Sequence, residues 1–472
     1  MKKILFILTL LTAGIFTSCD KMMDPIFDEP ADVRLQKALD HYQQTLVSAP
    51  NGWILTIPTG LGGVYRFWVS FDENNRVASA ADFNHKVMES SYRLRVISAP
   101  MLSFDTGCYI TQICDPDPSI SGAADSGTGQ KSDFDFYFLE ENAGSFLLLG
   151  RFNFTPAILE PASAAEAAAI LDGGFEKSNE ALTDFFGKVK YPAVNIDGKN
   201  LQLNVSTRSA SYQYWDDATA SLISGDSPCY VDLDGEVNGE QLGTVYFISE
   251  VPFMGKNIIQ LDWDEQAKAY QVKTDDGGSY PLFDNLEPII PIEMVLGVGL
   301  TYSGFRTDVA DLTGSLTGDF LQLYNDVNTK LGGLSNRSLD YIDFTLYPGA
   351  QSPVLIQYEE NGEDKLAQTV LEVTFRYVNS SGSGYNAQWY WRVTTDSNGF
   401  YTFDLMTQYP NRTNENNTRS AYLDVFDYIN GHRFKLSWIP NNTPGSSANI
   451  AGFYVVDSAG NETDSFIAGI VK

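Results

Sequence analysis

The sequence predicts a mainly β protein of the α+β class, built from antiparallel β-meander, sandwich or barrel-like units with a few helices. Aromatic residues make up 13% of the chain, with 25 Tyr and 29 Phe, and aromatic side chains favour strands. Short apolar runs alternate with turn residues: the runs 53–57 and 64–71 are separated by a Gly-rich turn, and Asp72-Glu-Asn-Asn follows the second. With 472 residues, 43% of them hydrophobic, the chain can bury a large core, so we expect two or three domains.

The first 19 residues have the pattern of a secretory signal with a lipoprotein-type ending. Lys2 and Lys3 precede an apolar run over 4–11, which is too short to span a bilayer. Phe16-Thr-Ser-Cys19 fits the looser bacterial lipobox, so we expect a signal peptide over 1–18 and acyl chains on Cys19. The alternative is an ordinary secretory signal in which Cys19 is incidental. The polar, proline-containing residues 19–30 then form the expected lipidated tether.

The net charge of the chain excludes one class of binding partner. Against 31 Lys and Arg stand 60 Asp and Glu, which gives a formal net charge of −29. Such a surface repels phosphate backbones, so nucleic acid is excluded as an expected partner. No later stretch approaches the roughly 20 apolar residues of a spanning helix. We therefore expect the mature chain to meet the membrane through the lipid on Cys19.

Cysteine and histidine give no sign of a metal or cofactor site. Beyond Cys19 the chain has Cys108, Cys114 and Cys229, an odd number for an oxidising compartment. On one continuous strand Cys108 and Cys114 would lie about 20 Å apart, so a bridge between them requires a turn. The alternative is that they are buried free thiols. There is no Cys-x-x-Cys, and the three His are far apart in sequence, so we expect neither a metal nor a cofactor.

Helical segments divide the β-rich chain. Apolar residues at three-and-four spacing predict a helix from residue 31 to the Pro50-Asn-Gly52 turn, followed by a meander of strands. An Ala-rich helix capped by Ser163 and Glu166, and a second helix over 179–188, close this part. A later helix over 316–331 is again followed by a meander. The expected domains are a helix plus β-meander domain over 31–190, a second β-rich unit over 191–300 and a C-terminal helix plus β-meander domain over 301–472.

Several stretches of the chain are similar to one known family. The longest are Leu46-Val-Ser-Ala-Pro-Asn-Gly-Trp53, Ser91-Tyr-Arg-Leu-Arg-Val-Ile-Ser-Ala-Pro-Met-Leu-Ser-Phe-Asp-Thr106 and Asp133-Phe-Asp-Phe-Tyr-Phe-Leu-Glu140. On these residues the chain resembles a Bacteroidetes lipoprotein family, domain-of-unknown-function family 4302. The family is similar to lipoproteins encoded beside SusC/SusD-type outer-membrane uptake pairs. The resemblance implies an accessory role at the outer membrane, on its cell-surface or periplasmic face, and assigns no functional residue.

Aromatic clusters are the candidate ligand-binding residues. In Trp389-Tyr-Trp391, strand alternation places Trp389 and Trp391 on one face, where two indoles could form a platform for a sugar ring or an extended peptide. The alternative is that this face belongs to the core. Tyr212, Tyr214 and Trp215 form a second cluster with the same two interpretations.

Two functions remain open. The first is a non-enzymatic binding or accessory protein of a SusC/SusD-type system for the uptake of a glycan or a peptide. The second is a surface hydrolase, a glycosidase or peptidase, whose catalytic carboxylates are hidden among the 60 Asp and Glu. No Gly-x-Ser-x-Gly surrounds a nucleophile, and the separation of two carboxylates cannot be read from sequence, so we name no catalytic residue.

Overall fold

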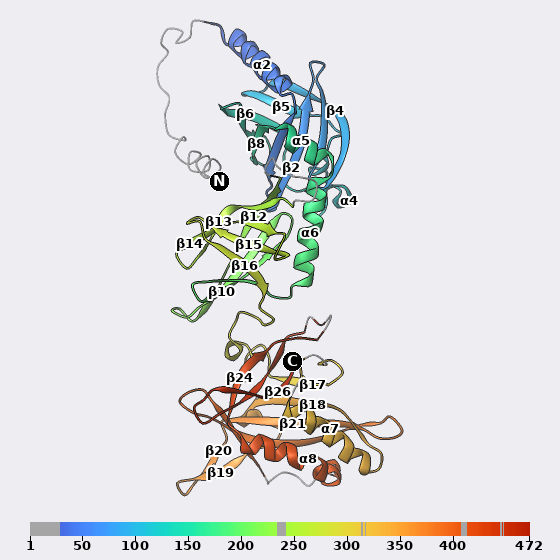
Figure 1. The fold of residues 1–472 in the computed structure, drawn as a ribbon, viewed down its shortest axis with the longest axis vertical. Helices are drawn as coiled ribbons and strands as arrows, with labels where there is room; N and C mark the ends of the chain where they lie inside the picture. The colour runs from blue at the N-terminus through green and yellow to red at the C-terminus, as the bar shows by residue number, and fades with distance from the viewer. Residues whose placement is uncertain are drawn as a thin grey trace. The chain divides into compact units, whose positions relative to one another are not determined.

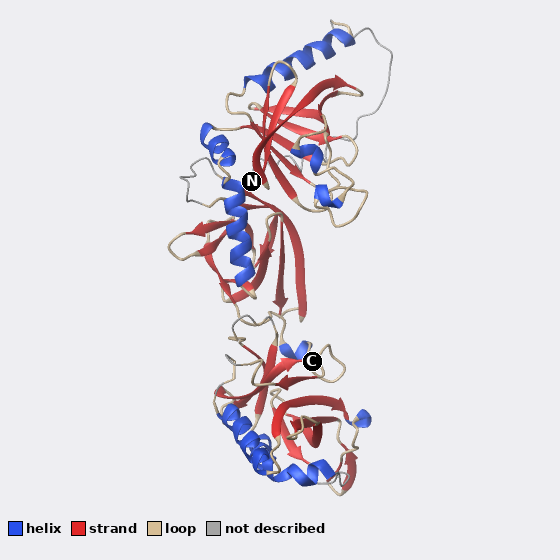
Figure 2. Ribbon diagram, turned by 90° about the vertical axis from the view of Figure 1, so that its right-hand side faces the viewer, coloured by secondary structure: helices blue, strands red, loops and turns tan. Residues whose placement is uncertain are grey.

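The computed structural model describes residues 29–233, 242–312, 315–316, 318–406, 413–443, 446 and 448–472. The expected signal peptide, Cys19 and residues 20–28 of the expected tether lie outside this part. The chain divides into two compact units, Met1–Gln213 with Ile223–Asp284 and Tyr214–Leu222 with Asn285–Lys472. The described strands form three closed barrels and one two-stranded sheet. Strands are the predominant element of the described part of the chain (Figure 1, Figure 2). The predicted mainly β class with antiparallel, barrel-like units is confirmed.

The first barrel follows chain order and closes where β1 pairs with β8. Its strands are β1 (Trp53–Pro58), β2 (Val64–Phe71), β3 (Arg76–Ala81), β4 (Asn84–Val96), β5 (Pro100–Phe104), β6 (Asp135–Asn142), β7 (Ser145–Gly150) and β8 (Pro156–Pro161). Inward-facing residues such as Leu55, Phe67 and Leu159 are buried completely. The predicted first helix is α2 (Ala31–Ser48), and it packs on the barrel through Tyr42, whose ring stacks on Phe138 at 3.9 Å.

Two helices lead from the first barrel to the second. The first is α5 (Ala164–Leu171), and its predicted cap is confirmed: Ser163 Oγ accepts from the Glu166 N–H, and Glu166 accepts from the Ser163 N–H. The second is α6 (Gly174–Lys188). The strands that follow are β9 (Pro192–Ile196), β10 (Lys199–Val205), β11 (Ser209–Asp216), β12 (Ser221–Asp232), β13 (Thr244–Phe253), β14 (Lys256–Asp264), β15 (Ala269–Thr274) and β16 (Ser279–Asp284). This barrel closes where β16 pairs with β9.

Two arginines connect these two barrels within the first unit. Arg66 of β2, only 4% exposed, donates through Nη1 to Asp232 Oδ1 at 2.6 Å and to the Val231 carbonyl at 3.2 Å. Arg208, from the turn before β11, donates through both Nη atoms to the two oxygens of Asp82, at 2.6 and 2.8 Å. Largely buried ion pairs of this kind fix geometry strongly, because an unpaired partner would be left desolvated, and the Arg208–Asp82 pair is also bidentate.

The third barrel and the two helices that pack beside it are formed by the C-terminal part of the chain. The strands of this barrel are β17 (Gly304–Thr307), β18 (Ser338–Pro348), β21 (Thr369–Val378), β22 (Gly384–Thr395), β23 (Tyr401–Leu405), β24 (Phe434–Ile439), β25 (Ile450–Val456) and β26 (Glu462–Val471). A hairpin of β19 (Gln357–Glu360) and β20 (Glu363–Leu366) is separate from it. Helices α7 (Asp319–Gly333) and α8 (Thr413–Gly431) pack together beside the barrel (Figure 1). The expected boundaries at 190 and 300 lie just before β9 and β17.

The three cysteines in the described part of the chain are free thiols. Cys108 and Cys229 are buried, and Cys114 is partly buried. Burial raises the pKa of Cys114 and of Cys229 to about 12 and also raises the pKa of Cys108. Of the two interpretations of Cys108 and Cys114, the structure shows the unbridged one.

None of the helices among the described residues is long and apolar enough to cross a membrane.

Candidate functional site

Trp389 and Trp391 lie in the core of the third barrel. Both are 0% exposed. Trp389 contacts the ring of Phe426 from α8 at 5.0 Å, and Trp391 Nε1 donates to Asn430 Oδ1 at 2.9 Å. Strand alternation placed the two indoles on one face as predicted, but that face points into the barrel, where α8 covers it. The core interpretation therefore holds, and these residues form no exposed platform.

The second aromatic cluster is divided by its strand. Tyr212 and Tyr214 share one face of β11, and Trp215 lies on the other, so the three rings make no single platform. The Tyr212 ring lies against the backbone of β12, because a Cβ added at Gly225 would be 2.5 Å from its hydroxyl. Tyr212 also lines a pocket of about 290 Å³ together with Asn204 and Asp226. Tyr214 and Trp215 belong to the segment that groups with the second unit.

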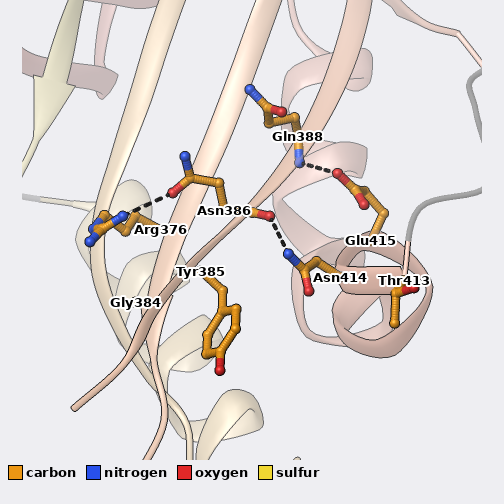
Figure 3. Close-up of a pocket in the computed structure, with 8 residues that line it drawn as sticks. All are labelled: Arg376, Gly384, Tyr385, Asn386, Gln388, Thr413, Asn414 and Glu415. Atoms are coloured by element: carbon orange, nitrogen blue, oxygen red, sulfur yellow. Dashed lines mark hydrogen bonds between the residues drawn. The ribbon is translucent and has the colours of Figure 1, made fainter.

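A larger pocket, which the sequence did not predict, lies in the third barrel at β21, β22 and the first turn of α8 (Figure 3). Its volume is about 460 Å³, within the usual range of ligand pockets. All its lining residues belong to one unit, and they are Arg376, Gly384, Tyr385, Asn386, Gln388, Thr413, Asn414 and Glu415. We call it the Tyr385 pocket.

The pocket exists because β22 is longer than its partner on one side. It pairs with β21 over 384–393, but among the described residues its register with β23 covers only 391–395. At residues 386–388 the first turn of α8, instead of a strand, lies along this edge of β22. Asn414 Nδ2 donates to the Asn386 carbonyl at 3.0 Å, and the Gln388 N–H donates to Glu415 Oε1 at 3.1 Å (Figure 3). Side chains thus satisfy the backbone groups that a neighbouring strand would otherwise pair.

The acidic wall of the Tyr385 pocket is a buried carboxylate. Glu415 is 3% exposed, and its Oε2 has no hydrogen-bond partner within the described part of the chain. Behind it, the Gln388 side chain donates to Glu372 Oε1 at 3.0 Å, and Glu372 also accepts from the Thr374 hydroxyl at 2.8 Å. A buried carboxylate oxygen without a hydrogen-bond donor costs free energy of folding.

The opposite wall combines an aromatic ring with a guanidinium. The Tyr385 side chain is 40% exposed, and its ring stacks on that of Tyr377 at 5.7 Å with 24° between the planes. Arg376 is held by Asp340 at 3.2 Å and by Asn386 Oδ1 at 3.3 Å. A Cβ at Gly384 would come within 2.4 Å of the guanidinium, so only glycine lets Arg376 lie across the start of β22.

These groups suit recognition better than bond cleavage. Amides both donate and accept, as paired hydroxyl groups require, and the exposed Tyr385 ring offers an apolar face. Glu415 is the single carboxylate among the lining residues, whereas glycoside cleavage uses two. Within the described residues, no three His, Cys, Asp or Glu side chains are placed to hold a metal ion.

A sequence signal for this site existed but was weak. The apolar residues Ala421, Tyr422, Val425, Phe426 and Ile429 recur at helical spacing and mark α8, the helix that supplies one wall. Nothing in the sequence shows that its first turn meets residues 386–388 of β22.

The fold and the pocket together define a chain of antiparallel barrels with a polar, ligand-sized pocket. The chain matches the family model described as domain of unknown function (DUF4302) over residues 23–264, more than half its length, and it belongs to that family. No curated protein matches it. Among solved structures, Caulobacter crescentus pol III beta matches the chain at 12% sequence identity and a TM-score of 0.13, with 93% of this chain and 98% of that one covered.

Proposed function

We propose that this protein is an outer-membrane-anchored lipoprotein that binds a ligand without converting it, as an accessory of a SusC/SusD-type nutrient uptake system. Three observations support the proposal. The N-terminal pattern predicts a signal peptide that ends before Cys19 and lipidation of Cys19. The chain belongs to the family described as domain of unknown function (DUF4302), and the resemblance of its sequence implies a likeness to lipoproteins encoded beside such uptake pairs. Its Tyr385 pocket has the groups of a binding site. The protein would lie on the cell-surface or the periplasmic face of the outer membrane.

The observation that carries the ligand-binding part is the presence of the exposed Tyr385 ring beside polar side chains around one pocket. A sugar ring presents C–H groups on one face and hydroxyl groups at its edge. Tyr385 would stack on the first, while Arg376 and Asn414 would bond to the second. A neutral glycan is therefore the favoured ligand, and a peptide is the other ligand class to screen.

Replacing Tyr385 by alanine is expected to weaken glycan binding about tenfold or more, because the stacking face is lost. Binding would be found by a thermal-shift screen of the soluble chain lacking Cys19 against neutral glycans and mixed peptides, then measured by calorimetric titration. The matched control is Tyr358→Ala, a tyrosine of β19 outside the pocket that contacts Arg392. Equal affinities for wild type and Tyr385→Ala would remove the pocket from the proposal.

The hydrolase alternative is tested in the same screen. Glu372 and Glu415 both bond to Gln388, and each keeps one oxygen without a hydrogen-bond partner in the described part of the chain, so a two-carboxylate site is the specific competitor. Cleavage of any glycan by the wild-type chain, abolished in Glu415→Gln, would replace binding by hydrolysis. We expect bound glycans to be recovered intact.

Replacing Cys19 by serine is expected to move the full-length protein from the membrane fraction to the soluble fraction. Serine has no thiol to acylate, and the acyl chains supply the membrane affinity. Cell fractionation with labelling by a palmitate analogue measures both effects, and Cys114→Ser serves as the control thiol. A Cys19→Ser protein that still carries label and sediments with membranes would contradict the anchor.

A further inference from the structure

A second polar pocket lies on the first barrel, far along the chain from Tyr385. It has a volume of about 500 Å³ and is formed by the turn between β2 and β3, by β4 and by Asp105 after β5. Its distinctive lining residues are Asn74, Asn75, Arg93, Arg95 and Asp105. We call it the Arg93 pocket. It lies inside the part of the chain that the family model covers, whereas the Tyr385 pocket lies outside it.

Two guanidinium groups stand side by side in the Arg93 pocket. Arg93 and Arg95 are two positions apart on β4, so they point to the same face. Arg95 is fixed: its Nε donates to Ser103 Oγ at 2.9 Å, and its Nη2 lies 3.0 and 2.9 Å from the two oxygens of Asp135. Asp135 itself is buried, at 3% side-chain exposure. The bonds to Ser103 and Asp135 therefore fix the guanidinium of Arg95, and the Arg95 side chain is 42% exposed.

Arg93 is held less firmly and reaches further into solvent. Its side chain is 66% exposed, and within the described residues its hydrogen bonding is limited to Nη2, which donates to Asp105 Oδ2 at 3.1 Å. The hydrogen bond from Ser91 and the neighbouring Arg93 lower the pKa of Asp105, which keeps this partner ionised. The Nε and Nη1 groups of Arg93 and the Nη1 group of Arg95 remain available as donors.

The arginines that are hydrogen-bonded at this pocket outnumber the carboxylates with which they pair. Arg93, Arg95 and Arg151 face two carboxylates here, Asp105 and Asp135. The chain as a whole carries a formal net charge of −29. Guanidinium forks match the geometry of carboxylate and sulfate groups. Asn74 and Asn75 at the rim supply amides, which suit hydroxyl groups.

We propose that the Arg93 pocket binds an acidic saccharide, with a carboxylate or sulfate group on Arg93 and Arg95 and hydroxyl groups on the asparagines. The saccharide class rests on the proposed glycan-binding function, whereas recognition of the anion stands on the geometry of this pocket alone. The protein then has two glycan sites of different charge preference, in separate units of the chain.

The test is calorimetric titration of the soluble chain with three probes at 50 and 500 mM NaCl. The probes are a galacturonic acid trisaccharide for carboxylate, a sulfated chondroitin disaccharide for sulfate, and maltotriose as the neutral reference. We expect at least one acidic probe to bind, Arg93→Gln to weaken it about tenfold or more, Arg93→Lys to weaken it less, and the higher salt to weaken it further. Which acidic probe binds identifies the anionic group.

The controls separate this inference from the Tyr385 site. Arg433→Gln removes a 33% exposed arginine that pairs with Asp396 in the third barrel, and it should leave acidic binding unchanged. Tyr385→Ala should also leave it unchanged. Wild-type affinity in Arg93→Gln, or binding of neither acidic probe, overturns the inference. Acidic binding that Tyr385→Ala abolishes and Arg93→Gln does not also overturns it, while leaving the proposed function in place.

Discussion

Replacing Asp82 by alanine is expected to destabilise the first unit by about 3–5 kcal/mol, the usual cost of removing one partner of a buried ion pair. Asp82 accepts from both Nη atoms of Arg208 and from the Arg66 N–H at 3.0 Å. Its side chain is 7% exposed and that of Arg208 18%, so water cannot replace the lost carboxylate. The guanidinium of Arg208 would remain over the Tyr65 ring, at 3.7 Å, without its counter-charge.

Differential scanning calorimetry measures this effect. A loss of this size lowers the melting temperature of a unit of this length by roughly 10 °C. The matched control is Asp184→Ala, which removes a 65% exposed carboxylate of the same unit that pairs with Lys188 on α6, and it should cost about 0.5 kcal/mol or less. If Asp82→Ala and Asp184→Ala had the same melting temperature, the Asp82–Arg208 pair would not be the contact that holds the first two barrels together.

Replacing Trp389 by alanine is expected to destabilise the third barrel by about 3–5 kcal/mol. The indole is 0% exposed and contacts the rings of Phe375, Tyr422 and Phe426 at 5.6, 5.0 and 5.0 Å between centroids. Its removal leaves a cavity between β22 and α8, and packed cores collapse only partly around such cavities.

Urea denaturation followed by tryptophan fluorescence and circular dichroism gives the free energy of unfolding. The contrast is Tyr385→Ala on the same strand, which removes a 40% exposed ring and should change stability by less than about 1 kcal/mol. If Trp389→Ala retained wild-type stability and lost glycan binding, the indole would be a ligand platform and the core interpretation would be wrong.

The sequence predicted the kinds of element well, because local patterns determine them. Alternation and turn residues indicated antiparallel strands, and the spacing of Ser163 and Glu166 indicated the capping box that begins α5. Closure into barrels was one of several possibilities, since it depends on pairing between strands far apart in sequence. In the first barrel Leu55 pairs with Leu159, and no local pattern shows that contact.

Long-range contacts also explain where the predicted strands end. Aromatic residues continue past β7 at Phe152 and Phe154, and such residues favour strands, but β7 ends at Gly150. The buried carboxylate of Asp133 accepts from the backbone N–H groups of Phe152, Asn153 and Thr155, which turns the chain out of the sheet. A Cβ at Gly150 would lie 2.0 Å from Asp133 Oδ2, so the glycine is required at this bend. Asp133 is too distant in sequence for this to be foreseen.

The candidate site, too, depends partly on local sequence patterns and partly on contacts between residues far apart in sequence. Alternation correctly placed Trp389 and Trp391 on one face of β22, but burial of that face depends on α8, which begins more than twenty residues later. The Tyr385 pocket needs the start of the same strand beside the first turn of that helix. A single exposed tyrosine among amides has no motif, so only the assembled barrel identifies it.

The measurement that tests the central claim most directly is a crystal structure of the chain in complex with the neutral glycan found by the screen. The proposed function predicts electron density for a sugar ring stacked on Tyr385, with hydroxyl groups within hydrogen-bond distance of Arg376 and Asn414. Density for the glycan elsewhere, with the Tyr385 pocket holding solvent, would contradict it.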